Sequence, residues 1–174
     1  MLLSVLFTIR LFTGDEQSLS DGWIVARQCT GVGYYAVMPH QPSVLFLCTH
    51  NAGRSQMAAG WLRSLSGGKV GVYSAGSSPG DAVNPVAVDA MAEVGIDIAA
   101  AQPQQWTDDM VRVADVIVSM GCGDTCPVYP GKRYLDWELD DPHGAGIDAV
   151  RPIRDEIEFR IRGLLDELGV EAVA

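Results

Sequence analysis

The residues with the clearest chemical potential are Cys48, Arg54 and Ser55, which follow an apolar run. Five residues separate the cysteine from the arginine, and a helical pattern begins directly afterwards. A tight loop in front of a helix collects backbone N–H groups and makes an anion site. The planar guanidinium of Arg54 suits two oxygens of a tetrahedral oxyanion. The same positive potential favours the thiolate form of Cys48. The stretch therefore predicts a nucleophilic thiolate that faces a bound oxyanion.

The alternative for Cys48 is a small buried residue that ends a core strand, because cysteine is often buried and inert. The cysteine, arginine and serine at this spacing favour the reactive interpretation. Ser55 can donate a hydrogen bond to the Cys48 sulfur or cap the helix, and both are possible together. Asn51 is expected to organise the loop through its side chain, or to serve only as a turn residue.

Two further cysteines, Cys122 and Cys126, follow a later apolar run, and glycines flank Cys122. Two thiols at this spacing can form a disulfide if the segment rearranges, and glycines allow such movement. If Cys122 attacks an oxidised Cys48, Cys126 can then resolve that bond by thiolate attack on sulfur. Paired structural thiols, or half of a zinc site completed by His50 and His143, are the alternatives.

The elements that must position these residues alternate along the chain. Strands are predicted at Val44–Cys48, Lys69–Gly76, Asp115–Met120 and Lys132–Trp137. Helices are predicted at Gln56–Ser66, Pro85–Val94 with Asn84 as N-cap, Thr107–Val113 and Arg151–Leu168. Strands separated by helices imply a parallel sheet, and ligands of such sheets bind beyond the carboxyl ends of the strands. Cys48 lies beyond the first such end.

The composition is that of a globular chain with one domain. It has 174 residues and a formal net charge of −10, which argues against nucleic acid or an anionic membrane as the main partner. The loop amides and Arg54 must therefore make a local positive site. Four cysteines without the pattern of a secreted disulfide scaffold indicate a reducing cytoplasm and functional thiols.

Residues 1–42 differ from the rest of the chain. Their first nine residues are apolar but too short to span a bilayer, and they lack the basic start of a secretory signal. We expect this segment to be a poorly ordered N-terminal extension or the product of an upstream start, with Met38 as the native start. Residues 43–174 are then the functional domain.

The pattern of Cys48, five residues, Arg54 and Ser55 resembles the phosphate-binding loop of low-molecular-weight protein tyrosine phosphatases and of arsenate reductases with the same fold. The residues from His50 to Ala58 resemble the arsenate reductase branch most closely. The resemblance runs from about Ser43 to Leu168 and implies a flavodoxin-like α/β fold, with an open, mainly four-stranded parallel sheet flanked by helices. It also implies an oxyanion loop made by Thr49, His50, Asn51, Ala52, Gly53, Arg54 and Ser55.

The resemblance also assigns Asp141 and favours a reductase. In this superfamily an Asp directly before Pro lies over the phosphate site as general acid, and a neighbouring carboxylate such as Asp140 favours its protonated form. An ordinary acidic turn is the alternative. Phosphatases often have tyrosines after this Asp-Pro pair, whereas His143 and Gly144 follow here. Reductases carry further cysteines after the third strand, as Cys122 and Cys126 do.

The implied reaction is the reduction of arsenate to arsenite in the cytoplasm, without an organic cofactor. Cys48 attacks arsenic, Asp141 donates a proton, Cys122 attacks Cys48, and Cys126 leaves a Cys122–Cys126 disulfide for thioredoxin. No metal is expected, since Ala59 stands where many thioredoxin-coupled relatives carry a cation-holding Glu.

Three alternatives stay open. The first is recycling by a low-molecular-weight thiol with a glutaredoxin-like protein. The second is a phosphatase acting on phosphotyrosine or another phosphomonoester. The third is a phosphate-binding regulator without enzymatic activity.

Overall fold

The computed structural model describes residues 40–121 and 128–173. Most of the predicted N-terminal extension, with Cys29, lies outside this range, and so do Cys122 and Cys126. The elements in chain order are β1 (Ser43–Cys48), α1 (Arg54–Ser66), β2 (Gly71–Gly76), α2 (Pro85–Ala92), α3 (Asp108–Val113), β3 (Val116–Ser119), β4 (Arg133–Asp136) and α4 (Ile147–Glu167). All four predicted strands and all four predicted helices are present, with shifted ends.

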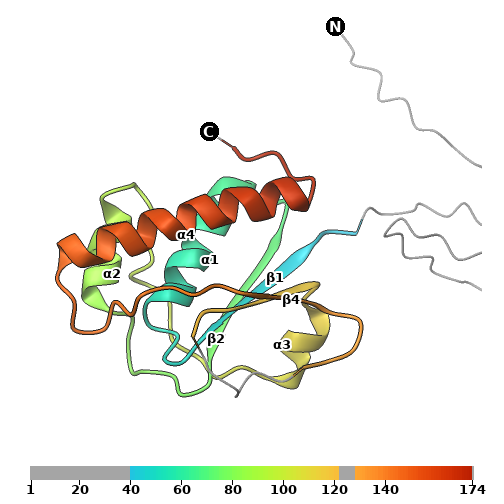
Figure 1. Cartoon of the computed structure of the whole chain (residues 1–174), viewed down its shortest axis with the longest axis horizontal. Helices are drawn as coiled ribbons and strands as arrows, with labels where there is room; N and C mark the ends of the chain where they lie inside the picture. Colours follow the sequence, from blue (N-terminus) through green and yellow to red (C-terminus); the bar gives the residue numbers. More distant parts are fainter. Residues whose placement is uncertain (1–39, 122–127, 174) are drawn as a thin grey trace, which may run out of the picture. The chain divides into compact units, whose positions relative to one another are not determined.

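The four strands form one parallel sheet in the order β2-β1-β3-β4 (Figure 1). Cys48 pairs with Gly76, and Leu47 pairs with Ser119, which in turn pairs with Asp136. The carboxyl ends of all four strands therefore meet at one edge. The chain passes from β1 to β2 on one side and later to β3 on the other, so β1 stands where the strand order reverses. Open parallel sheets bind ligands at this kind of position.

Side chains of β1 alternate between two hydrophobic layers. Val44, Phe46 and Cys48 face a large core cluster shared with α1, α2 and α4. Leu45 and Leu47 face a smaller cluster that includes residues of α3. Every residue of β1 is buried, as expected for a central strand covered on both faces. This burial holds Cys48 in place at the end of the strand.

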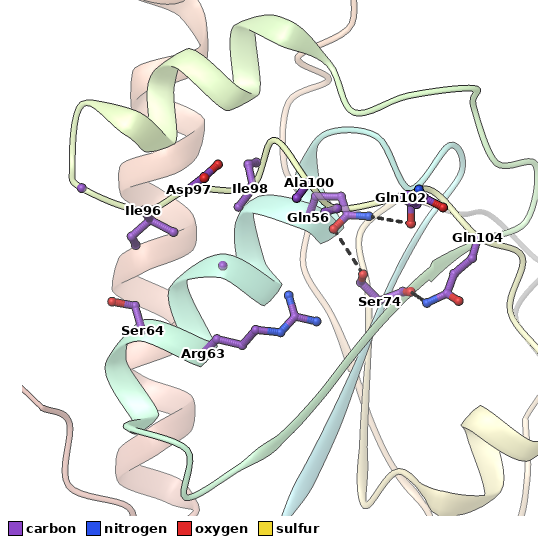
Figure 2. Close-up of a pocket in the computed structure, with 13 residues that line it drawn as sticks. Gln56, Arg63, Ser64, Ser74, Ile96, Asp97, Ile98, Ala100, Gln102 and Gln104 are labelled. Carbon is purple, nitrogen blue, oxygen red and sulfur yellow. Dashed lines mark hydrogen bonds between the residues drawn. The ribbon is translucent and has the colours of Figure 1, made fainter.

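Helix α1 begins at Arg54, two residues earlier than predicted, and ends at Gly67 in the left-handed conformation. A cavity of about 670 Å³ lies beside the helix, between α1, β2 and the segment 95–104 (Figure 2). Its polar lining includes Gln56, Ser74 and Arg63, and burial lowers the pKa of the Arg63 guanidinium. The cavity shares no lining residue with the pocket around Cys48.

Two details of the predicted helices are wrong. Helix α4 begins at Ile147, not at Arg151, so Pro152 lies inside it. The proline cannot donate to the carbonyl of Asp148, but the additional turn buries Val150 completely in the core. Val94 is 38% exposed beyond the end of α2, where Ala87, Ala90 and Met91 are the buried residues. In the described part of the chain, no helix combines the length and apolar character needed to cross a membrane.

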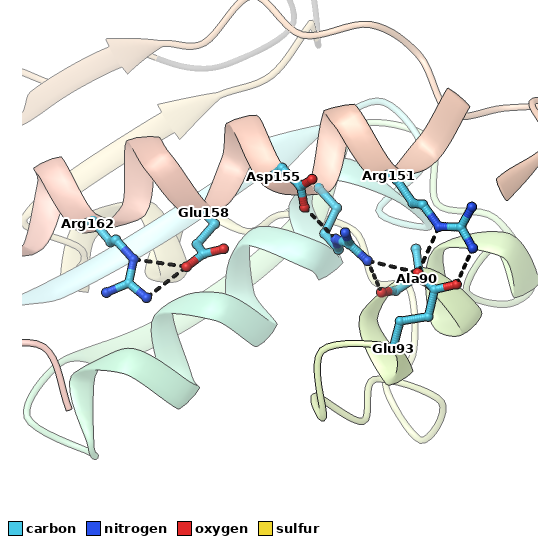
Figure 3. A network of polar contacts seen from close by, with 7 residues as sticks. Ala90, Glu93, Arg151, Asp155, Glu158 and Arg162 are labelled. Carbon is cyan, nitrogen blue, oxygen red and sulfur yellow. Dashed lines mark hydrogen bonds and ion pairs between the residues drawn. The ribbon is translucent and has the colours of Figure 1, made fainter. Parts of the chain in front are cut away.

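An ion-pair network joins α2 to α4 (Figure 3). The buried Arg154 of α4 donates to the carbonyl of Ala90 at 2.8 Å and to Glu93 at 3.1 Å. Arg151 donates to both carboxylate oxygens of Glu93, at 2.9 and 2.6 Å. Glu93 thus receives two guanidinium groups at the C-cap of α2. The Arg151 hydrogen bond is the main cause that lowers the pKa of Glu93 from 4.5 to about 2.

This lowered pKa predicts a defined pH dependence of stability. Ion pairs of Glu93 stabilise the fold above pH 4.5, and this contribution is lost as the pH falls towards 2. We expect Glu93→Gln to be less stable than the wild type at neutral pH, with the difference narrowing over that acidic range. Urea unfolding at a series of pH values measures this difference in the free energy of unfolding. Glu158→Gln is the control, because its partner Arg162 lies on the same helix. A constant difference between Glu93→Gln and wild type would contradict the assignment.

Candidate active site

Cys48 is the last residue of β1 and is 3% exposed. Its Sγ accepts a hydrogen bond from the Asn51 N–H at 3.2 Å and lies 3.0 Å from the Ser55 Oγ. The sulfur faces a small cavity of about 40 Å³, lined by the loop, by Asn84 and by Asp141–His143. The buried sulfur is thus in hydrogen-bond contact with one backbone N–H and one hydroxyl group.

The direction of the Ser55 hydrogen bond follows from Asn51. The Asn51 Nδ2 donates to the Ser55 Oγ at 2.8 Å. The hydroxyl accepts this bond, so its own proton is available for the Cys48 sulfur. Ser55 is not the N-cap of α1, as the alternative interpretation had it, because Gly53 occupies that position. Asn51 is fully buried with φ of 50°, a left-handed conformation that asparagine tolerates better than most residues.

The loop between β1 and α1 turns its carbonyl oxygens outward. The carbonyls of Thr49, His50 and Ala52 accept hydrogen bonds of 2.8–2.9 Å from the N–H groups of Ser78, Gly80 and Asn84 respectively. In a trans peptide the N–H points opposite to the C=O. The N–H groups of His50, Asn51 and Gly53 therefore point inward, and that of Asn51 reaches the sulfur. Together with the start of α1, they make a loop of the kind that can bind an anion.

Arg54 is the first residue of α1 and is 8% exposed. Its Nη1 lies 3.4 Å from the Leu139 carbonyl, and its Nη2 lies 3.6 Å from the Asp141 Oδ2. Gly121 closes the other side, where a Cβ would come within 2.9 Å of Nη1. The Gly121 φ of 74° also requires glycine. The guanidinium is thus held beside the loop, with one long ion pair to an exposed carboxylate.

Asp141 lies on the loop that covers the site, and its side chain is 56% exposed. The adjoining Pro142 is buried and packs against Gly53, where a Cβ would lie 2.8 Å from its Cγ. Asn84 joins the parts, because its N–H donates to the Ala52 carbonyl and its Nδ2 donates to the Pro142 carbonyl at 3.2 Å. The structure therefore brings Cys48, Arg54 and Asp141 together, although they are separated along the chain.

The sequence identified Asn84 only as a helix cap, which it is, with its Oδ1 accepting from the Val86 N–H. Its contact with Pro142 spans 58 residues and has no local signal. Thr49 similarly donates to the Gly121 carbonyl at 3.2 Å. This bond ties the oxyanion loop to the residue directly before Cys122. The rings of His50 and His143 lie 6.1 Å apart at the same pocket. Among the described residues, no group of three or more His, Cys, Asp or Glu residues is arranged to hold a metal.

Comparison with known families decides the relationship. The model of the low molecular weight phosphotyrosine protein phosphatases matches residues 43–174. The chain belongs to this family. Its sheet, with Cys48 and Arg54 at the carboxyl edge, is the predicted fold.

Similar members of the family are named arsenate reductases. The arsenate reductase of Halalkalibacterium halodurans is 42% identical over 129 residues, which are 68% of this chain and 91% of that protein. The glutaredoxin arsenate reductase of Synechocystis is 34% identical over 128 residues, covering 72% of this chain and 97% of that protein. The structure of a thioredoxin-dependent arsenate reductase from Corynebacterium glutamicum superposes with a TM-score of 0.66 at 46% identity, over 74% of this chain and 62% of that one.

The close approach of Gly76 to the loop generates a prediction. A Cβ at Gly76 would lie 2.6 Å from the Thr49 carbonyl oxygen and 2.9 Å from the Asn51 N. We expect Gly76→Ala to displace the loop, to slow alkylation of Cys48 and to cost about 1–3 kcal/mol of stability. Gly163→Ala is the matched control, because its Cβ meets open space, and alanine in a helix stabilises by up to about 1 kcal/mol. Equal behaviour of both variants would contradict the packing argument.

Proposed function

We propose that this family member reduces arsenate to arsenite, with the activity in residues 43–174. The observation that carries the proposal is the Cys48 sulfur, held by two donors inside a loop of inward amides beside Arg54. The names of the similar proteins support the substrate. The small cavity, with His50 and His143 at its rim, favours an inorganic oxyanion over an aryl phosphate.

In the first step arsenate occupies the loop, with its oxygens on the inward N–H groups and on Arg54. The oxyanion replaces Asp141 as the partner of the guanidinium, since their pair is long at 3.6 Å and the Asp141 carboxylate is more than half exposed. The Cys48 thiolate then attacks arsenic(V) and forms an S–As bond. Asp141 donates a proton to the departing oxygen, which leaves as water.

The second step transfers two electrons. The Cys122 thiolate attacks the Cys48 sulfur, the S–As bond breaks, and its electron pair stays on arsenic, which leaves as arsenite. The product is a Cys48–Cys122 disulfide. Cys126 then attacks Cys122, which restores the Cys48 thiolate and leaves a Cys122–Cys126 disulfide. The anchoring of Gly121 by Thr49 supports this assignment, because Cys122 is the next residue.

An external dithiol must reduce the final disulfide. Thioredoxin is the proposed reductant, in line with the thioredoxin-dependent relative from Corynebacterium glutamicum. A low-molecular-weight thiol with a glutaredoxin-like protein is the second candidate, because a relative that is 34% identical is named a glutaredoxin arsenate reductase. The two candidates differ in their need for Cys126.

Arsenate-dependent NADPH oxidation with thioredoxin and thioredoxin reductase tests the thiol–disulfide exchange among the three cysteines. We expect turnover by the wild type, and loss of turnover in Cys48→Ser, Cys122→Ser and Cys126→Ser, since each thiol makes or breaks a bond. Cys29→Ser is the matched control and should retain activity. Activity that requires a small thiol and survives the loss of Cys126 would replace thioredoxin by the second reductant. Aryl phosphate hydrolysis without arsenate reduction would establish a phosphatase and overturn the proposal.

The role of Asp141 is tested by a single turnover of the reduced enzyme. We expect Asp141→Asn to bind arsenate but to form arsenite about 10²–10⁴ times more slowly, as for loss of a general acid. Asp109→Asn serves as control, because Asp109 is an exposed carboxylate of α3 and does not line the cavity. Equal rates in both variants would show that the proton comes from another group.

A further inference from the structure

The hydrogen bonds at Cys48 continue beyond Asn51, through Gln56, to the segment 102–104. We propose that Gln56 is a positioning residue that fixes the direction of these bonds and thereby favours the Cys48 thiolate. This inference rests on the proposed function only in that Cys48 is taken as the nucleophile. Gln56 does not line the pocket around Cys48, so it acts through other residues.

Asn51 can take only one amide orientation. Its Oδ1 accepts from the backbone N–H of Gln104 at 2.9 Å and from the Gln56 Nε2 at 3.2 Å. A backbone N–H can only donate, so the oxygen of Asn51 must face Gln104. The amide nitrogen then faces Ser55, as the 2.8 Å bond requires. This orientation leaves the Ser55 proton for the sulfur.

Gln56 is likewise fixed, and it is 2% exposed. Its Nε2 lies 3.5 Å from the carbonyl of Gln102, which can only accept, and its Oε1 accepts from the Ser74 Oγ at 3.4 Å (Figure 2). Ser74 also receives the Gln104 side chain on its carbonyl, at 3.0 Å. Two backbone groups therefore fix the donor and acceptor directions along this chain of hydrogen bonds. They are the Gln104 N–H and the Gln102 carbonyl.

The opposite amide orientation of Asn51 would reverse these hydrogen bonds. If the oxygen of Asn51 faced Ser55, the hydroxyl would donate to Asn51 and the sulfur would lose a donor. An acceptor in place of the Gln56 Nε2 favours that arrangement, because two acceptors then face each other 3.2 Å apart. Loss of one donor reduces the stabilisation of a thiolate. Gln56 thus acts on Cys48 by adding a second donor to the Gln104 N–H, so that both disfavour the wrong orientation of Asn51.

The test is the pH profile of Cys48 alkylation in the full-length chain, with iodoacetamide as probe and fragment mass spectrometry to resolve Cys48 from the other cysteines. We expect Gln56→Glu to move the midpoint of the profile upward by about one pH unit. Because alkylation follows the thiolate fraction, this is about a tenfold lower rate below the midpoint. Gln56→Met, which keeps the volume of the side chain but removes its three hydrogen bonds, should lower that rate about threefold.

Gln102→Glu is the charge-matched control. It places a carboxylate at the cavity that Gln56 also lines, but only the backbone carbonyl of Gln102 takes part in the hydrogen bonds of Gln56. We expect its midpoint to equal that of the wild type, and thermal melting verifies that each variant is folded. A wild-type midpoint in both Gln56 variants would overturn the inference, as would an equal shift in Gln102→Glu. The measurement needs no arsenate, so a shifted midpoint in a protein that fails to reduce arsenate would refute the proposed function alone.

Discussion

The structure depends on one constraint: the loop after β1 must point its N–H groups at Cys48 without leaving its carbonyls unpaired. Buried carbonyls need partners, and the segment after β2 supplies them through Ser78, Gly80 and Asn84. That segment can lie close enough only because Gly76 has no side chain where the loop passes. The left-handed Asn51 completes the turn. The geometry of the proposed anion site is therefore a product of β2 and the following segment as much as of the loop.

A positive site in a chain of net charge −10 requires that Arg54 stay available. Other arginines are committed to carboxylates across the described surface, as in the pairs Arg133–Glu167, Arg151–Glu93, Arg160–Glu156 and Arg162–Glu158. Arg54 differs, because its one carboxylate partner within residues 40–121 and 128–173 is 3.6 Å away and more than half exposed. An incoming oxyanion can therefore replace this partner, because the pair is longer than an ordinary hydrogen bond.

Local patterns in the sequence were sufficient to predict the helices and strands and the position of the loop after β1. The Asn84 and Thr107 caps were predicted from residue type and are present in the structure. The start of α4 was missed because a proline near a helix start usually marks its first turn, whereas burial of Val150 favours a longer helix here. The bond from the Gln104 backbone to Asn51 spans 53 residues, and a backbone donor leaves no trace in residue types. The predicted relay cysteines lie outside the described residues, so their roles remain predictions.

The anion-binding loop cannot by itself separate arsenate from phosphate, because amides and a guanidinium recognise charge and tetrahedral shape, which both anions share. Discrimination must come later, when a second thiolate attacks the Cys48 sulfur. Arsenic(V) accepts the electron pair of the S–As bond, whereas phosphorus(V) is not reduced by thiols. One fold can therefore support a phosphatase or a reductase, depending on which groups reach Cys48 after the first attack. The hydrogen bond from Thr49 to Gly121 matters for this reason, since it brings the residue before Cys122 to the loop that is proposed to hold the substrate.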